Sequence, residues 1–254
     1  EKLISYDGGK YALCDAAYAK LEDYRVDNAI IIAAGFGSRL LPHSYDTPKG
    51  FLEVHGKRMI ERQIEQLLEA SITDITIAVG HLKEKFDYLI DKYGVELGCR
   101  RDYAIKNNLS TLYYCRDLLK NTYVLVGNNY MAKNLFHKYE YHSWYTAVKS
   151  DGETDEWCLR YDKRGRINEI KIGGKDEWHM YGRAYFSNDF SKKIVPLIEE
   201  TYHRPGTSRF YWEDVLRENL DTLEIYINKQ PRNTVYKFED LEELKLFDKS
   251  YIDR

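Results

Sequence analysis

The sequence predicts a three-layer α/β fold, in which helices cover both faces of a mainly parallel, mixed β-sheet. The run over 29–33 is continuously apolar and is followed closely by Gly35, as expected for a strand buried on both faces. Apolar residues then recur at helical spacing over 59–70, and 75–79 forms a second apolar run that ends at Gly80. A strand, a helix and a strand in this order are typical of a parallel β-α-β unit.

The alternation of helices and strands continues along the chain. Helical patterns over 82–92 and 109–119 precede a short apolar strand over 123–126, which ends at Gly127. Strands that alternate with helices indicate a largely parallel sheet between two helical layers. The sequence therefore predicts one α/β domain over 28–254.

Beyond Ser143 the pattern changes to short strands joined by turn signals. Three strands are expected, over 157–161, 167–172 and 182–186, with the turn Asp162-Lys163-Arg164-Gly165 between the first two. They predict a small β-rich insertion over the sheet. The remaining elements expected are helices over 189–202 and 211–219, strands over 223–227 and 234–238, and a charged helix from Glu239.

Residues 1–27 are interpreted as an N-terminal extension, because they lack the strand pattern that follows. Asp15 is expected to cap a short helix over 16–24, whose apolar residues fall at helical spacing. The chain begins at Glu1 without a methionine, so a fragment or a processed product is expected.

Composition argues against several classes of protein. The 254 residues include 38 Lys and Arg against 41 Asp and Glu, a formal charge of −3, so no basic face for nucleic acid is expected. No apolar run approaches the roughly 18 residues of a membrane helix. The histidines are scattered and form no catalytic motif. The cysteines form no C-x-x-C pair, which argues against a disulfide framework or a structural zinc site, and without a signal peptide a reducing cytoplasm is expected.

A glycine-containing loop directly after the first strand carries the strongest chemical signal. Glycines at this place let backbone N–H groups approach a polyphosphate, and an arginine adds a bidentate charge for the outer phosphates. The loop is neither a P-loop nor a dinucleotide fingerprint, because no Gly-Lys-Ser/Thr ends it and Leu40 occupies the third glycine position. The motif predicts binding of a nucleoside triphosphate. It reads Ala33-Ala34-Gly35-Phe36-Gly37-Ser38-Arg39-Leu40-Leu41-Pro42, and Thr47-Pro48-Lys49-Gly50 follows.

This stretch resembles the signature of the nucleotidyltransferases that activate phosphorylated metabolites, written roughly A-A-G-x-G-x-R-L and then P-K. The resemblance implies a Rossmann-like nucleotidyltransferase fold and direct attack by a substrate phosphate on the α-phosphate of a nucleoside triphosphate, with release of pyrophosphate. It implies that Lys49 and Arg39 are catalytic, because a cation must bring two anionic phosphates together. The residues implied for triphosphate binding are Ala33, Ala34, Gly35, Gly37, Ser38 and Arg39.

Further segments, from about residue 28 to residue 247, resemble the bacterial CTP:phosphocholine cytidylyltransferases of the same superfamily. The resemblance implies CTP and phosphocholine as partners and contact of Gly80 with the base; a simple strand-end turn is the alternative. Asn107 and Asn108 either cap the following helix or bind the nucleotide, and Asn108 is kept as a nucleotide-binding candidate. The segments are Val79-Gly80-His81-Leu82-Lys83-Glu84, 103–113, Asn128-Asn129-Tyr130, Asp155-Glu156-Trp157 and Tyr211-Trp212-Glu213-Asp214.

A phosphocholine substrate has a recognisable chemical requirement. A quaternary ammonium has no hydrogen-bond donor, so aromatic faces and a nearby carboxylate are the specific means of binding it. Core packing is the competing interpretation for any one of the aromatic residues; for Trp157 and Tyr211 together, a cage is expected. The residues that the resemblance brings together are Trp157, Tyr185, Tyr211 and Trp212, with Glu156 or Asp155 as the anion.

The expected metal site departs from the family pattern. The family has an aspartate that ligates Mg²⁺ after the strand over 123–126, and this chain has Asn128. A neutral amide oxygen is a weaker ligand than a carboxylate for a hard cation. The resemblance places the second ligand on Glu213, with Asp214 as a neighbouring alternative. Three explanations stay open: a natural variant whose Mg²⁺ is held mainly by the triphosphate, a deliberately inactivated chain, or a degenerate copy that binds without turnover.

The predicted activity is Mg²⁺-assisted formation of CDP-choline from CTP and phosphocholine, without a covalent intermediate. One alternative is a related enzyme for another acceptor, such as phosphoethanolamine, a phosphonate or a sugar 1-phosphate. The other is a non-catalytic nucleotide or choline sensor, since residues 1–27 faintly resemble the end of a winged-helix DNA-binding domain and Asn128 weakens the metal site. The oligomeric state is not predicted.

Overall fold

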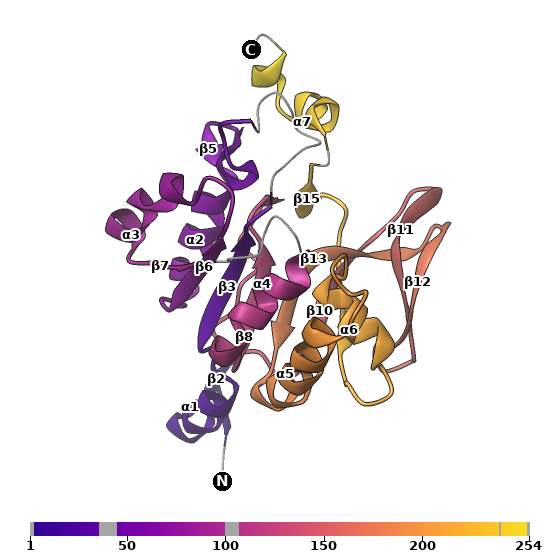
Figure 1. Cartoon of the computed structure of the whole chain (residues 1–254). Helices are drawn as coiled ribbons and strands as arrows, with labels where there is room; N and C mark the ends of the chain where they lie inside the picture. The colour runs from indigo at the N-terminus through magenta and orange to yellow at the C-terminus, as the bar shows by residue number, and fades with distance from the viewer. Residues whose placement is uncertain (1–2, 36–44, 100–106, 239, 253–254) are drawn as a thin grey trace.

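The computed structural model describes residues 3–35, 45–99, 107–238 and 240–252. Nine strands of this part of the chain form one central sheet with helices on both faces (Figure 1). β14 (Tyr226–Gln230) pairs with β10 (Trp144–Lys149), which pairs with β13. The rest of the sheet has the order β12 (Ile167–Lys175), β11 (Glu153–Tyr161), β13 (Trp178–Phe186), β8 (Thr122–Val126), β3 (Asn28–Ala33), β6 (Ile75–Val79) and β7 (Glu96–Cys99).

The four consecutive strands β8, β3, β6 and β7 are parallel, with β7 at the edge of the sheet, and β13 joins β8 in the antiparallel direction. This arrangement confirms the predicted α/β class with a mixed sheet. The apolar runs explain the parallel strands, because β3 and β6 are buried along nearly their whole length and contact both helical layers.

Alternate side chains of β3 build two separate cores. Ile30 and Ile32 belong to one core, and Ile31 belongs to the other, together with Ile77 of β6. The first core is covered by α4 (Asn108–Tyr114), α5 (Asn188–His203) and α6 (Trp212–Glu218), and the second by α2 (Met59–Glu69) and α3 (Tyr88–Tyr93). The three layers predicted from the sequence are therefore present.

The β-rich segment differs from the predicted insertion. β11 and β12 form the expected hairpin, and Oδ1 of Asp162 accepts hydrogen bonds from the backbone N–H groups of Arg164 and Arg166 in its turn. The hairpin continues the central sheet through β13 instead of lying over it. β10 was not predicted, although five of its six residues are buried, because its run of aromatic and small residues follows directly on a loop.

The N-terminal segment also differs from the prediction. β1 (Ile4–Asp7) and β2 (Lys10–Leu13) form a hairpin where no strand was expected. α1 (Asp15–Leu21) starts at Asp15 itself, so the residue before it occupies the N-cap position and Asp15 is not the cap. A 3-10 turn over Glu22–Tyr24 continues the helix.

Several other boundaries were wrong. The helix expected over 82–92 is a 3-10 turn (Lys83–Phe86) followed by α3, because Leu82 takes a left-handed conformation with φ of 54°. The helix expected over 109–119 ends at Tyr114 and is followed by a 3-10 turn (Arg116–Leu118).

The small C-terminal core joins β4 (Glu53–Val54), β5 (Lys57–Arg58), β9 (Asn129–Met131), β15 (Val235–Lys237), α7 (Leu241–Phe247) and a 3-10 turn (Lys249–Tyr251).

Among the helices of the described residues, none combines the length and apolar character needed to cross a membrane.

Candidate functional site

The carboxyl ends of β3 and β8 lie in close contact. The backbone N–H of Gly127, directly after β8, donates a hydrogen bond to the carbonyl of Ile32 at 2.9 Å. A Cβ on Gly127 would lie 3.3 Å from Cβ of Ala33, so a larger residue would push the two strand ends apart. After β3 the chain continues through buried Ala34 to exposed Gly35. The sequence-predicted residues Gly37, Ser38 and Arg39 lie outside the described residues.

Lys49 is placed next to this edge of the sheet by Gly50. Lys49 begins the 3-10 turn Lys49–Phe51, and a Cβ on Gly50 would lie 2.9 Å from the carbonyl oxygen of Gly127. Phe51 anchors the turn from the other side, because its ring packs 4.6 Å from the ring of Phe86. The segment that carries Lys49 is therefore held against the residue that precedes Asn128.

Asn128 and Asn129 follow β8 but have different environments. Asn129 is buried. Its side-chain amide donates a hydrogen bond to the backbone carbonyl of Tyr181 at 3.0 Å, and its backbone carbonyl accepts one from the Gln63 side-chain amide at 2.9 Å. Asn128 lies in the turn before β9 and is partly exposed. Asn129 is thus a structural residue, and Asn128 is the residue of the pair that can meet a ligand.

Gly80 lies at the carboxyl end of β6, beside the same edge. It is buried and forms an isolated bridge with Leu82. The backbone N–H of His81 donates to the carbonyl of Ala34 at 3.5 Å, which brings the segment after β6 next to the start of the phosphate-binding motif. Contact of Gly80 with a nucleotide base stays a prediction.

Glu213 is a half-buried acid in the first turn of α6. Its two carboxylate oxygens accept hydrogen bonds from the Tyr145 hydroxyl at 3.0 Å and from the Asn108 side-chain amide at 3.5 Å. Burial raises the pKa of Glu213 to about 7, and the neighbouring Asp214 also raises it, while the two hydrogen bonds lower it. This carboxyl therefore holds its proton more readily than an ordinary glutamate, and a nearby cation would favour its charged form.

Tyr145 connects Glu213 with the end of β8. This tyrosine is 2% exposed, and burial raises the pKa of its hydroxyl well above the usual value, with Glu213 and Glu156 adding to the effect. The backbone of Gly182 also hydrogen bonds this hydroxyl. A Cβ on Gly182 would approach the Asn129 amide nitrogen at 3.0 Å, so contacts run from Glu213 through Tyr145 and Gly182 to Asn129, the residue after Asn128.

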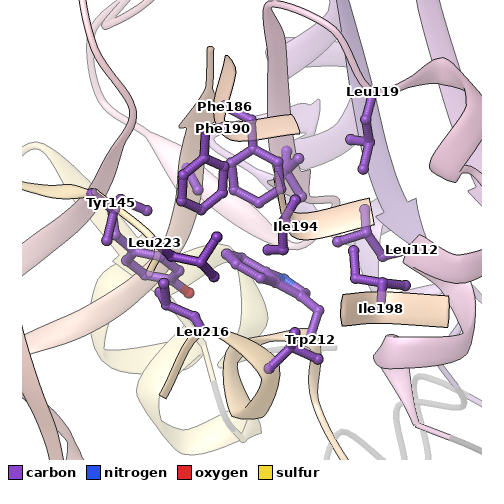
Figure 2. Close-up of a cluster of buried hydrophobic side chains, with 14 of the residues drawn as sticks. Leu112, Leu119, Tyr145, Phe186, Phe190, Ile194, Ile198, Trp212, Leu216 and Leu223 are labelled. Carbon is purple, nitrogen blue, oxygen red and sulfur yellow. The ribbon is translucent and has the colours of Figure 1, made fainter. Parts of the chain in front are cut away.

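Tyr145 is the site residue that the sequence did not suggest. The missed strand β10 carries it, and the continuous run of aromatic, β-branched and small residues over 144–148, all of them buried, is the signal that would have found it. Figure 2 shows Tyr145 beside Trp212 and Leu223 in the core.

The two asparagines before α4 have separate roles. The side chain of Asn107 accepts a hydrogen bond from the Asn108 backbone at 2.9 Å, so Asn107 is the helix cap. Asn108 joins two helices: its amide nitrogen donates to Glu213, and its amide oxygen accepts from the backbone of Trp212 at 2.9 Å. The nucleotide-binding role predicted for Asn108 stays a prediction.

Asp214 is occupied by the structure of α6. Its carboxylate accepts from the Tyr211 backbone at 2.8 Å and pairs with Arg217 at 3.0 Å, and it is 6% exposed. Glu213 is therefore the acid of this pair that can hold a cation. Among the described residues there is no group of three or more His, Cys, Asp or Glu side chains arranged to hold a metal ion.

Two of the predicted aromatic residues lie beside each other. The rings of Trp157 on β11 and Tyr211 before α6 meet edge to face, with centroids 6.2 Å apart and planes at 80°. Tyr211 is 45% exposed and Trp157 is half-buried, so both rings are open to a ligand. Glu156, the predicted anion, pairs with Lys237 at 3.1 Å.

The other two predicted aromatic residues are core residues, and their assignment to a cage is wrong. Tyr185 is fully buried and packs against Tyr123 and Trp144. Trp212 is 2% exposed and packs against Phe186 and its neighbours, as Figure 2 shows. Both side chains are enclosed by apolar neighbours, so no ring face is left for a ligand.

Comparison with known proteins agrees with this geometry. The family model of the nucleotidyl transferases matches residues 28–164. The choline-phosphate cytidylyltransferase of Streptococcus pneumoniae is 36% identical over 217 residues, which cover 85% of this chain and 95% of the relative. The 2-aminoethylphosphonate cytidylyltransferase of Lancefieldella rimae is 32% identical over 89% of this chain and 93% of the relative. A solved structure of the Streptococcus pneumoniae CTP:phosphocholine cytidylyltransferase aligns with a TM-score of 0.85 at 35% identity, over 89% of this chain and 99% of that one.

Proposed function

The chain belongs to the nucleotidyl transferase family, and from that premise we propose that it transfers CMP from CTP to phosphocholine, giving CDP-choline and pyrophosphate. The cytidylyltransferases among the similar proteins support CTP as the nucleotide. The observation that carries the choice of acceptor is the exposed edge-to-face pair of Trp157 and Tyr211. A trimethylammonium group gains affinity from aromatic faces and has no N–H to donate to a carboxylate.

The proposed reaction is one displacement at the α-phosphorus of CTP. A phosphate oxygen of phosphocholine forms the new P–O bond, and the bond to the β-phosphate oxygen breaks, so that pyrophosphate leaves with that oxygen. In the proposed reaction Lys49 reduces the repulsion between the two anions, and the close approach of Gly50 to the carbonyl of Gly127 supports this role. Arg39 shares this role in the proposal, and the triphosphate is bound by Ala33, Ala34, Gly35, Gly37, Ser38 and Arg39.

The acids and amides near β8 fit Mg²⁺ that arrives with CTP. Glu213 is a half-buried carboxylate whose hydrogen bonds come from neutral groups, and Asn128 offers one amide oxygen. One carboxylate and one amide are few ligands for Mg²⁺, which commonly takes its remaining ligands from substrate phosphates and water. When bound, the ion neutralises charge on the triphosphate. Asn128 and Glu213 are the residues proposed to hold it.

A 2-aminoethylphosphonate acceptor is the second candidate, favoured by the 32% identical relative. Its primary ammonium requires hydrogen-bond acceptors, and the predicted anions are Glu156 and Asp155, which precede Trp157 in the chain. Glu156 already pairs with Lys237 at 3.1 Å, so less of its charge is available to a second ammonium. This pairing favours the quaternary ammonium of phosphocholine.

The test is pyrophosphate release from CTP with each acceptor in turn. Phosphocholine, phosphoethanolamine, 2-aminoethylphosphonate and a sugar 1-phosphate would be compared with the chain as given and with Asn128→Asp. We expect phosphocholine to give a kcat/KM at least about tenfold above the others. Equal rates for all acceptors would reject the acceptor assignment. Retained ligand binding without turnover in both proteins would instead favour a sensor.

Matched tryptophan variants test the aromatic pair directly. Trp157→Leu should raise the KM for phosphocholine about tenfold, because it removes one face of the cage. Trp178→Leu is the control, since Trp178 is also half-buried, packs on the same core and has a lysine over its ring. The control should leave the KM for phosphocholine within about twofold.

A further inference from the structure

Trp157 and Tyr211 belong to a closed ring of four contacts between β11 and α6. The Tyr211 backbone donates to Asp214 at 2.8 Å, and Asp214 pairs with Arg217 at 3.0 Å. The guanidinium carbon of Arg217 lies 4.9 Å from the centre of the Trp157 ring. The Trp157 and Tyr211 ring centroids, 6.2 Å apart, complete the ring of contacts. Each member therefore restrains the next, and Arg217 is the link that joins the helix to the tryptophan.

Arg217 lies over one face of the Trp157 indole and leaves the other face uncovered by its guanidinium. A planar guanidinium stacks on an aromatic face and excludes other groups from it. One face of Trp157 is therefore covered, and a ligand cation is confined to the remaining surface beside Tyr211, which is 45% exposed.

A second cation beside an onium pocket would normally weaken binding, because like charges repel. Here Asp214 compensates the charge of Arg217, and the carboxylate is only 8% exposed at its side chain. The same carboxylate is fixed by the Tyr211 backbone, so it cannot turn away without releasing the start of α6.

From this ring of contacts we propose that Arg217 is a specificity-determining positioning residue, which orients Trp157 for a quaternary ammonium acceptor. The inference rests on the proposed function and deepens it. Arg217 does not touch the reacting phosphates; it acts through the indole. A primary ammonium acceptor, which is bound by hydrogen bonds to acids and gains less from an oriented ring, should depend on Arg217 less.

The test compares Arg217→Gln and Arg217→Lys with the wild-type chain. KM and kcat are measured for phosphocholine and phosphoethanolamine, and phosphocholine binding in the presence of CTP is measured by calorimetry. Arg217→Gln should raise the KM and Kd for phosphocholine about tenfold, with kcat within about twofold and the KM for CTP unchanged. The KM for phosphoethanolamine should change less than about threefold. Arg217→Lys keeps the charge without the planar stack, so its KM for phosphocholine should lie between those of the wild-type chain and Arg217→Gln.

Arg204→Gln is the matched control. Arg204 also stacks on an aromatic ring, that of Phe210 at 5.5 Å, and also pairs with an acid, Glu218 at 2.6 Å. Its loss should lower stability by a similar amount and leave both acceptors unchanged. If Arg217→Gln melts early, Arg217→Lys decides the comparison.

The outcomes separate the two proposals. If the wild-type chain prefers phosphocholine and neither Arg217 variant changes its KM, the role of Arg217 is rejected and the proposed function stands. Equal losses for both acceptors would likewise reject it, because they indicate a structural role. If the wild-type chain neither binds phosphocholine nor uses it, the proposed function is rejected and the inference falls with it.

Discussion

Glu61 on α2 and Glu213 on α6 are acids that are at least half-buried, on opposite faces of the sheet. Different groups compensate the negative charge of each. Glu61 accepts from the Tyr88 hydroxyl at 2.6 Å and pairs with Lys92 at 2.9 Å, and these contacts outweigh burial and lower its pKa. Glu213 receives hydrogen bonds from neutral groups, the Tyr145 hydroxyl, the Asn108 amide and its own backbone N–H, and burial raises its pKa to about 7.

The difference separates a structural acid from a candidate functional one. Glu61 has its positive partner built into the fold, and the network continues to Arg58, which stacks on Phe51 at 4.9 Å near the turn of Lys49. In the described part of the chain, no lysine, arginine or histidine is among the groups that shift the pKa of Glu213. An acid held in this way gains most from a cation that comes with a ligand.

The strongest way to break the comparison is Glu213→Gln. If Glu213 holds the cation of the nucleotide complex, its loss should lower kcat/KM for CTP and phosphocholine by about 10³-fold. Pyrophosphate release measures this effect. Glu218→Gln, in the same helix, is the control and should keep its activity. A glutamine variant at 213 with more than about a third of wild-type activity would contradict the role of Glu213.

Glu61→Gln should show the opposite profile, a loss of stability without a specific loss of chemistry. The substitution removes the charge that the Tyr88 hydroxyl and the partly exposed Lys92 and Arg58 contact, and we expect the free energy of unfolding to fall by about 1–2 kcal/mol. The lowered pKa stabilises the fold above the ordinary value of 4.5, and this contribution is lost as the pH falls through the lowered value. Urea unfolding at pH 7 and pH 4 measures both effects.

Two results would count against this assignment of Glu61. One is a difference between the variant and the wild-type chain that grows as the pH falls. The other is an equally large loss in Glu69→Gln, at the exposed end of the same helix.

Asn128→Asp should strengthen the proposed cation site by adding a second carboxylate to that of Glu213. A carboxylate binds a hard cation more strongly than an amide does, so the Mg²⁺ concentration that gives half-maximal activity should fall about tenfold. Titration of Mg²⁺ at fixed CTP measures the change. An unchanged Mg²⁺ dependence would show that Asn128 does not face the ion.

The smallest expected effect is a gain of stability in Glu213→Gln without a metal ion. The raised pKa means that the folded state loses stability as the pH rises from 4.5 through about 7, because an uncompensated charge forms in a half-buried place. At pH 8 the variant should therefore be more stable than the wild-type chain by about 1 kcal/mol, allowing for solvent screening. The gain should vanish near pH 4.5. Denaturant unfolding in EDTA at both pH values measures it, and equal stabilities of the two proteins at pH 8 would contradict the prediction.

Continuous apolar runs made the inner strands predictable. β6 has the expected bounds, and β3 and β8 differ from the prediction by one residue each. The N-terminal hairpin was not predicted because its apolar residues are exposed: Tyr6 and Tyr11 are 61% and 79% exposed, and the register pairs them on one face. Hydrophobic pattern reports burial, and a strand that contributes to no core gives little signal.

The candidate site was predictable where backbone geometry decides and less so where side-chain direction does. The sequence marks Gly50 beside Lys49 and Gly127 at the end of a strand, and the structure adds the close approach, since a Cβ on Gly50 would lie 2.9 Å from the Gly127 carbonyl oxygen. Tyr211 and Trp212 are neighbours of the same chemical type, and their burial differs because one precedes α6 and the other lies in its first turn, facing the core. Only the packing of α6 on the sheet separates these two roles.

The most direct test is a crystal structure of the chain with CTP and phosphocholine, and the deciding measurement is the distance from the trimethylammonium nitrogen to two ring centres. We expect about 6 Å or less to both Trp157 and Tyr211, with the triphosphate between Lys49 and Glu213. A bound phosphocholine that lies away from both rings, or a triphosphate remote from Lys49 and Glu213, would contradict it.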